Sequence, residues 1–182
     1  MKTYSENAIP DELQLSDLGP LAACAALRSV YVRGSRVSDL SPLAACTGLT
    51  RLDCNSTAVA HLGPLAACTK LKNLNAGRNK ALADLSPLAT CSGLKVLHVY
   101  GTAVTDLGPL AACTNLHTFS CTSTPVRDLG PVAALPLLRD LHCARTVRGV
   151  ELQRARVPEL ASMPMPSRAY EAAPDAGYSS EG

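Results

Sequence analysis

Asp39-Leu40-Ser41-Pro42-Leu43-Ala44-Ala45-Cys46 is a stretch that this chain of 182 residues repeats, with few changes, along most of its length. The copies are separated by 22 residues, except for one step of 23, and they begin at Asp17, Asp39, His61, Asp84, Asp106 and Asp128. A fixed period of this size predicts a solenoid, because a unit this short cannot bury its apolar face alone and must stack on its neighbours.

The residues between these copies follow a second pattern, L-x-x-L-x-(C/V/A)-x-x-(T/N/S), whose nine residues we number as repeat positions 1 to 9. The pattern begins at Leu27, Leu49, Leu71, Leu94, Leu116 and Leu138. Apolar residues at positions 4 and 6 alternate with polar ones, which is the period of a strand with one buried face. Parallel pairing of successive strands needs a crossover of about a dozen residues or more. The proline-containing segment supplies it as a short helical turn, so we expect an α/β solenoid of parallel strands and short 3-10 or α turns.

Together, the two patterns resemble the repeats of the leucine-rich-repeat family, over about Leu13 to Leu152. The V-x-D-L-x-P-L wording, present at residues 37–43, is similar to the subtype of roughly 22 residues in internalins and in a regulatory subunit of protein phosphatase 1. The A-A-C-T-x-L wording also resembles repeats of trypanosomatid proteins. The resemblance implies that the strands line a concave face and the short turns a convex face. It does not indicate a function, because this family hosts many functions.

The chain divides into three predicted segments: an N-terminal segment over 1–12, the solenoid over 13–152, and a tail over 153–182. The solenoid holds about six repeats and a partial first unit, and the tail is rich in proline and small polar residues, which predicts that most of it is disordered. One extra residue near Lys80-Ala81 predicts a local bulge in the third repeat. We also expect an intracellular, cytoplasmic protein, since the first residues lack an apolar signal-peptide core and no apolar run is long enough to span a membrane.

The eight cysteines follow the repeat, which favours a structural role. Five share the last position of the proline segment and three share position 6: Cys24, Cys46, Cys68, Cys91 and Cys113, then Cys54, Cys121 and Cys143. No C-x-x-C pair is present, so the usual zinc spacing is missing, and a free cysteine behaves as a small buried apolar residue. We therefore predict buried thiols, with no metal site and no cofactor. Oxidation of neighbours in one column, such as Cys121 and Cys143, stays open if their Cβ directions allow it.

A row of aspartates precedes the prolines: Asp17, Asp39, Asp84, Asp106 and Asp128, with His61 in the remaining place. Stacked carboxylates suggest calcium as one interpretation. We favour the other, in which each aspartate accepts a backbone N–H and starts the short turn, as an N-cap does. Position 9 carries serine or threonine in every repeat except for Asn79, and a hydroxyl there is expected to bond backbone groups of the turn.

Side chains at positions 2, 3, 5, 7 and 8 are expected to face solvent on the strand side of the solenoid. Eight of the 17 lysines and arginines lie there and two aspartates oppose them, an excess of about +6 in a chain of formal net charge +2. Such a patch attracts acidic partners, and tyrosine and arginine are frequent in binding hot spots. The candidate partner-binding residues are Arg28, Tyr31, Arg33, Arg51, Asp53, Lys72, Asn75, Arg78, Lys95, His98, Tyr100, His117, Arg139, His142 and Arg145.

These observations predict a non-catalytic protein–protein interaction module that binds an acidic or phosphorylated segment of an unidentified protein on its basic concave face. Three alternatives stay open: ordinary solubilising charges, a nucleic-acid-binding repeat protein, and a scaffold of the protein phosphatase 1 regulatory type, which rests on the resemblance alone. The pI of about 8.1 and the 3% aromatic content argue against nucleic acid. We find no nucleophile elbow, phosphate loop or H-E-x-x-H motif, so no enzyme is predicted.

Overall fold

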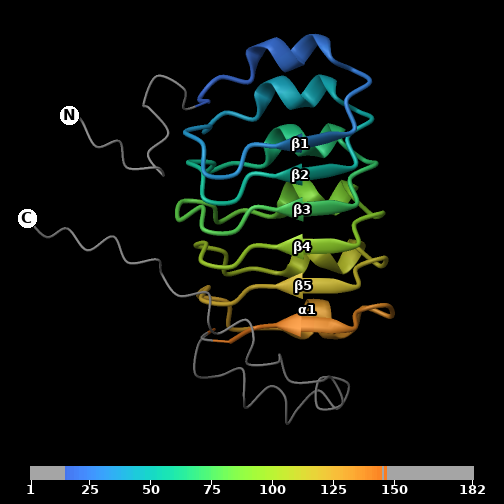
Figure 1. The fold of residues 1–182 in the computed structure, drawn as a ribbon. Coiled ribbons are helices and arrows are strands. Elements are labelled where there is room, and N and C mark those ends of the chain that lie inside the picture. The colour runs from blue at the N-terminus through green and yellow to red at the C-terminus, as the bar shows by residue number, and fades with distance from the viewer. Residues whose placement is uncertain (1–14, 145, 147–182) are drawn as a thin grey trace, which may run out of the picture.

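The computed structural model describes residues 15–144 and 146, and it contains one parallel sheet in which every strand is three residues long. The strands follow one another in the sheet in the order of the chain, and Figure 1 shows them as successive rungs of one stack. They are β1 (Ser29–Tyr31), β2 (Arg51–Asp53), β3 (Asn73–Asn75), β4 (Val96–His98), β5 (Thr118–Ser120) and β6 (Asp140–His142). The predicted α/β solenoid of parallel strands is confirmed.

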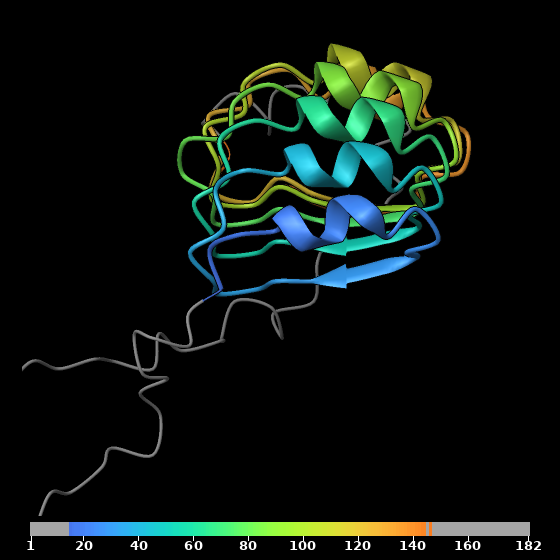
Figure 2. The same ribbon diagram turned by 90° about the horizontal axis from the view of Figure 1, so that it is seen from above.

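Each crossover between strands contains a short helix with proline in its first turn, as predicted, and a further helix of this kind precedes β1. Five are 3-10 helices: η2 (Gly19–Ala23), η3 (Ser41–Ala45), η4 (Gly63–Ala67), η5 (Ser86–Thr90) and η6 (Gly108–Ala112). The sixth is the α-helix α1 (Gly130–Ala133). Figure 2 shows the molecule as two layers, with the helices stacked on one side and the strands on the other. None of the helices that the structure describes has the length and apolar character needed to cross a membrane.

The strands pair in a constant register, so that equivalent repeat positions lie side by side. Val30 lies beside Leu52, and Leu52 beside Leu74. The extra residue of the third repeat shifts the numbering between β3 and β4 by one, since Asn73 pairs with Val96. It is absorbed outside the ladder, in a turn where the Leu82 N–H donates to the Asn79 carbonyl over 3.0 Å. The expected bulge therefore lies at the predicted place and leaves the sheet regular.

The core lies between the two layers and is almost wholly aliphatic. Leu43, Leu65, Leu88 and Leu110 of the 3-10 helices are completely buried, as are the leucines at position 1 from Leu49 to Leu116. Phe119 is the one aromatic side chain among the buried residues of the described part of the chain. Burial of each such side chain stabilises the fold by roughly 1.5–3 kcal/mol, so stability depends on many equal contributions.

Four cysteines of the helix column form a ladder of thiols that joins each repeat to the one before. The Cys46 thiol lies 3.5 Å from the Leu21 carbonyl oxygen, Cys68 3.4 Å from that of Leu43, and Cys113 3.5 Å from that of Leu88. All three thiols are buried, and the same holds for Cys91. A thiol is a weak donor that fits among packed leucines, which explains why cysteine recurs at this position.

The prediction of buried thiols is wrong at the first member of this column. Cys24 is exposed, because no repeat of the described chain precedes it, and its thiol lies 3.9 Å from the Pro20 carbonyl oxygen of its own helix. In the other column Cys54 and Cys121 are buried, whereas Cys143 in the last repeat is half-buried. Burial raises the pKa of Cys54 and of Cys121 to about 12.

The aspartate row has the structural role that we favoured. Asp17, Asp39, Asp84 and Asp106 each accept the backbone N–H two residues ahead over 2.7 Å, and Asp128 does so over 2.8 Å. The hydrogen bonds to Ser41 and Ser86 hold the pKa of Asp39 and of Asp84 below the ordinary value. The hydroxyls at position 9 also behave as predicted, since those of Ser35, Thr57, Thr102 and Thr124 donate to the carbonyl three residues back.

The remaining segment predictions fall outside the structure. The N-terminal segment over 1–12 and the tail over 153–182 both lie outside the described residues, as does Arg145. The described part of the solenoid begins at Leu15, within the partial first unit.

Truncation of Leu74 should destabilise the repeats on both sides of it. This side chain is 1% exposed, and its strand lies between those of Leu52 and Leu97. We expect Leu74→Ala to lower the free energy of unfolding by about 2–5 kcal/mol, measured by denaturant titration with circular dichroism. Lys72→Ala, at an exposed position two residues earlier, is the control and should change it by less than about 0.5 kcal/mol. Equal effects of the two variants would contradict the register.

The thiols should differ sharply in reactivity toward an alkylating reagent near pH 8. Cys24 should be modified fast because it is exposed, whereas Cys68 and Cys113 should be protected because burial raises the pKa of each to about 11. Mass spectrometry of the native protein after short exposure checks this, and Cys24→Ser should remove the fast phase. Rapid modification of Cys68 in the folded protein would show that solvent reaches the thiol ladder, and would contradict its burial.

Candidate functional site

The candidate site is the strand face, by which we mean the side chains at repeat positions 2, 3, 5, 7 and 8. Within β2, Arg51 is exposed, Leu52 is buried and Asp53 is half-buried, and the other strands alternate in a similar way. Since side chains of a strand point alternately to its two faces, positions 3 and 5 lie on the side of the sheet away from the helices. Figure 2 shows that no helix of the described residues covers this side.

The cations of the strand face are free of partners within the described chain. Seven of the eight predicted lysines and arginines are described, and all seven are exposed: Arg28, Arg33, Arg51, Lys72, Arg78, Lys95 and Arg139. None of them makes an ion pair or a side-chain hydrogen bond with another described residue. Their charge is therefore directed to solvent and is not neutralised by the fold.

The two aspartates of this face are engaged elsewhere. The Asp53 carboxylate accepts the backbone N–H of Asn55 over 3.0 Å and is half-buried. Asp140 is exposed and accepts the Thr118 hydroxyl over 3.2 Å. Neither carboxylate pairs with a cation among the described residues, so the excess of positive charge that the sequence predicts is present on one face.

Six of the seven described cations form two rows at the two ends of the strands, and the seventh, Arg51, lies within β2. Position 2, directly before the strand, carries Arg28, Lys72, Lys95 and Arg139, while positions 7 and 8, after the strand, carry Arg33 and Arg78. Arg78 is held in the left-handed region with a φ of 61°, like Gly34 and Gly101 at the same repeat position. A non-glycine residue tolerates this conformation at a cost of about 1 kcal/mol. The turn therefore sets the direction of Arg78.

The middle of the strand face is polar and only weakly charged. Asn75 and His98 at position 5 are half-buried, and the Asn75 side-chain oxygen accepts the Gly77 N–H over 3.3 Å. Burial lowers the pKa of His98, and the nearby His142 lowers it further, against a smaller opposing effect of Asp53. His98 is therefore neutral near pH 7. His117 lies at position 2 and contacts the Asn115 carbonyl oxygen through Nδ1 over 2.6 Å.

Tyr100 is held by the fold, which the sequence analysis missed. Its ring lies over Gly77, where an added Cβ would come within 2.6 Å of a ring carbon. Its hydroxyl is 2.6 Å from the Asn55 side-chain nitrogen, which also donates to the Gly77 carbonyl over 3.1 Å. Asn55 is 1% exposed as a result, so the expectation that position 7 faces solvent is wrong there. The signal was present, because position 7 reads Asn, Gly, Tyr in three successive repeats and a glycine lets the outer two meet.

Two further residues at these positions are buried against prediction, Gly77 at position 7 and Ser120. Ser120, at position 5 of β5, is 7% exposed. The described partner-binding candidates, including Tyr31 at 68% exposure, are all exposed or half-buried and lie on the strand face. Sequence reasoning therefore places the candidates on one surface. The structure adds which of their side chains make hydrogen bonds within the protein, as those of Asp53, Asn75 and Tyr100 do.

Comparisons with known proteins show that the fold is similar to that of internalins of Listeria monocytogenes. A comparison with protein-family models gives no match, and a search of curated proteins gives none either. Among solved structures, the internalin InlF is 34% identical to this chain, with a TM-score of 0.69. The matched region covers 70% of this chain and 38% of the InlF chain. Internalin C2 is 26% identical with a TM-score of 0.67, over 72% and 57% of the two chains.

The functional domain of InlJ, which includes a cysteine ladder, is also similar, at 24% identity and a TM-score of 0.62. At this identity the likeness concerns the fold alone. It covers 71% of this chain and 27% of that of InlJ. The chain thus spans less than two thirds of the length of each of these three proteins.

Loss of the Tyr100 hydroxyl should destabilise the fold, because it leaves the buried Asn55 amide with one partner fewer. We expect Tyr100→Phe to lower the free energy of unfolding by about 1–2 kcal/mol. Tyr31→Phe is the matched control and should have no effect, since Tyr31 is exposed and its hydroxyl has no partner among the described residues. Thermal unfolding of both variants measures this, and equal stabilities would contradict the Tyr100–Asn55 contact.

Proposed function

The chain belongs to the leucine-rich-repeat family, and we propose that it is a non-catalytic interaction module that binds an acidic or phosphorylated segment of a protein partner on its strand face. The observation that carries this proposal is the set of seven exposed cations without partners in the described chain. A surface of this kind attracts anionic groups over about 8 Å at physiological salt, and each arginine offers a planar pair of donors to a carboxylate or a phosphate.

The arrangement of the cations supports an extended ligand more than a compact one. Lys72 and Lys95 directly precede the adjacent strands β3 and β4, and Arg28 and Arg139 continue the same row toward the two ends of the sheet. Adjacent strands are about 4.8 Å apart, so the row presents charge along the length of the stack. An acidic segment lying across the strands would meet several cations in turn, with the polar middle of the face beside it.

The proposed partner is a protein, and its identity is left to experiment. Neutral His98 and the half-buried Asn75 provide hydrogen bonds without charge, which suits a peptide with polar side chains between its acidic ones. The intracellular location expected from the first residues stays a prediction, and so does the role of Arg145.

Reversal of charge on the strand face should abolish capture of an acidic peptide. We expect Arg51→Glu with Lys72→Glu to weaken binding of a labelled oligoglutamate peptide by at least about tenfold, through loss of attraction and new repulsion. The control is Lys80→Glu with Arg127→Glu, at exposed positions outside the strand face, which changes the net charge by the same amount, from +2 to −2. Fluorescence anisotropy at low and physiological salt measures both.

Two outcomes would count against the proposal. Equal weakening by the two double variants would show that only net charge matters, which is the expectation for ordinary solubilising charges. Tighter binding of a labelled single-stranded RNA than of the peptide, with a steep salt dependence, would favour a nucleic-acid partner instead. A phosphoserine version of the peptide then separates carboxylate from phosphate recognition.

A further inference from the structure

The first strand of the sheet, β1, has no strand of the described residues beside it on its outer side. In the interior, the N–H at position 3 donates to the preceding strand, as Arg51 does to the Arg28 carbonyl over 3.1 Å. The carbonyl at position 5 accepts from the preceding repeat, as that of Asp53 does from the Val32 N–H over 2.8 Å. The same groups of β1 belong to Ser29 and Tyr31, and they have no partner among the described residues. Such an edge is a template for another strand.

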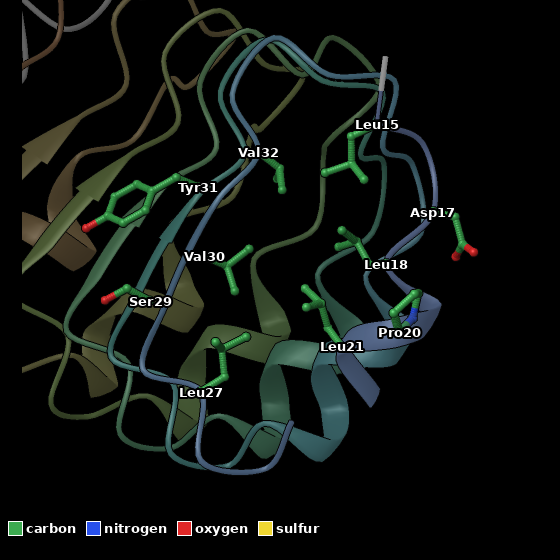
Figure 3. Close-up of a pocket in the computed structure, with 10 residues that line it drawn as sticks. All are labelled: Leu15, Asp17, Leu18, Pro20, Leu21, Leu27, Ser29, Val30, Tyr31 and Val32. Carbon is green, nitrogen blue, oxygen red and sulfur yellow. The ribbon is translucent and has the colours of Figure 1, made fainter. Parts of the chain in front are cut away.

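The core beside this edge is open as well. A hollow of about 320 Å³ lies at the end of the stack (Figure 3), and its lining includes Leu21, Leu27, Ser29, Val30, Tyr31 and Val32. Leu21 and Leu27 are half-buried, whereas Leu43 and Leu49, which follow them by one repeat, are fully buried. This end therefore has the surface of an interior interface between repeats, and no repeat of the described residues covers it.

We propose that this end is a dimer interface, in which β1 pairs antiparallel with β1 of a second copy of the chain. The two-fold axis passes at Tyr31, so that Tyr31 lies opposite its own copy and Ser29 opposite Arg33 of the partner subunit. Both N–H and C=O of Ser29, Tyr31 and Arg33 then point toward the partner, as the odd positions of the interior strands point toward the preceding repeat. The six-stranded sheet becomes a continuous sheet across the dimer.

The side chains fit this register on both faces of the new pair. Figure 3 shows Val30 and Val32 pointing toward the leucines of the hollow, while Ser29 and Tyr31 point away from it. In the dimer Val30 lies opposite Val32 of the partner subunit, which joins the two hollows into one apolar layer. Tyr31, at 68% exposure the most exposed large apolar side chain described, packs on its copy at the centre of the interface.

The charges of the edge also permit a symmetric partner. Arg28 and Arg33 are exposed and lie on either side of β1. With Tyr31 on the axis, Arg28 faces Gly34 and Arg33 faces Ser29, so no arginine lies opposite another. A two-fold interface requires a surface that complements itself. In this register the edge of β1 meets that requirement, because apolar residues lie opposite apolar residues and each arginine lies opposite a small residue.

A charge-swap at residue 31 tests the dimer. Sedimentation velocity of the full chain from about 1 μM to about 1 mM should show a concentration-dependent dimer. Tyr31→Lys and Tyr31→Glu should each be monomeric at concentrations where the wild type is dimeric, with dissociation constants raised at least about tenfold by like charges directly opposite. An equimolar mixture of the two variants should dimerise again, because lysine then lies opposite glutamate.

The control is Asn75→Lys, at the same repeat position of an interior strand, which should leave the oligomeric state unchanged. A wild type that stays monomeric over the whole range overturns the proposal, whether the end is covered by residues 1–14 or by another protein. A dimer that both Tyr31 variants retain also overturns the proposal. An equimolar mixture of the two variants that stays monomeric does the same, because residue 31 would not then face its own copy. Circular dichroism shows that each variant is folded.

Discussion

The stacking of one repeat on the next is the interaction on which the rest of this structure depends. No single repeat has a core of its own, because its strand is three residues long and its helix is one or two turns. Burial comes from the neighbours: leucines pack between rungs, strands exchange backbone hydrogen bonds, and the thiols of the cysteine ladder lie against carbonyls of the preceding repeat. Stability of this kind is close to a sum of nearest-neighbour terms.

The same constraint produces the surface to which we assign function. Since equivalent positions stack at a constant register, a side chain at one repeat position becomes part of a row across the sheet, and substitutions there are free of the packing that limits the core. Arginine and lysine accumulate in such rows, without carboxylate partners in the described chain. At β1, the first strand of the described residues, the packing surface has no neighbour among those residues, which is why we propose the second interface at that end.

Most of the fold was predictable because the repeat displays each structural requirement several times over. The alternation at positions 4 and 6 predicts the strands, and proline predicts the helical turns. The aspartates predict where each helical turn starts, because each accepts the backbone N–H two residues ahead. The sequence is less informative where a contact crosses several repeats or where a repeat lacks a neighbour. Tyr100 reaches Asn55 across Gly77, and Cys24 is exposed at the open end, since a pattern shared by all repeats carries no information about a single one.

The most direct test of this account is amide hydrogen exchange of the native protein at single-residue resolution. The amides of Cys54, Ala76 and Val99 each donate to the carbonyl at position 5 of the next repeat over 2.8 Å, and their side chains are fully buried. If stacking stabilises the chain cooperatively, these three amides exchange slowly and with similar free energies of opening. Rapid exchange at any of them, or free energies that differ from repeat to repeat as in independent units, would contradict the central claim.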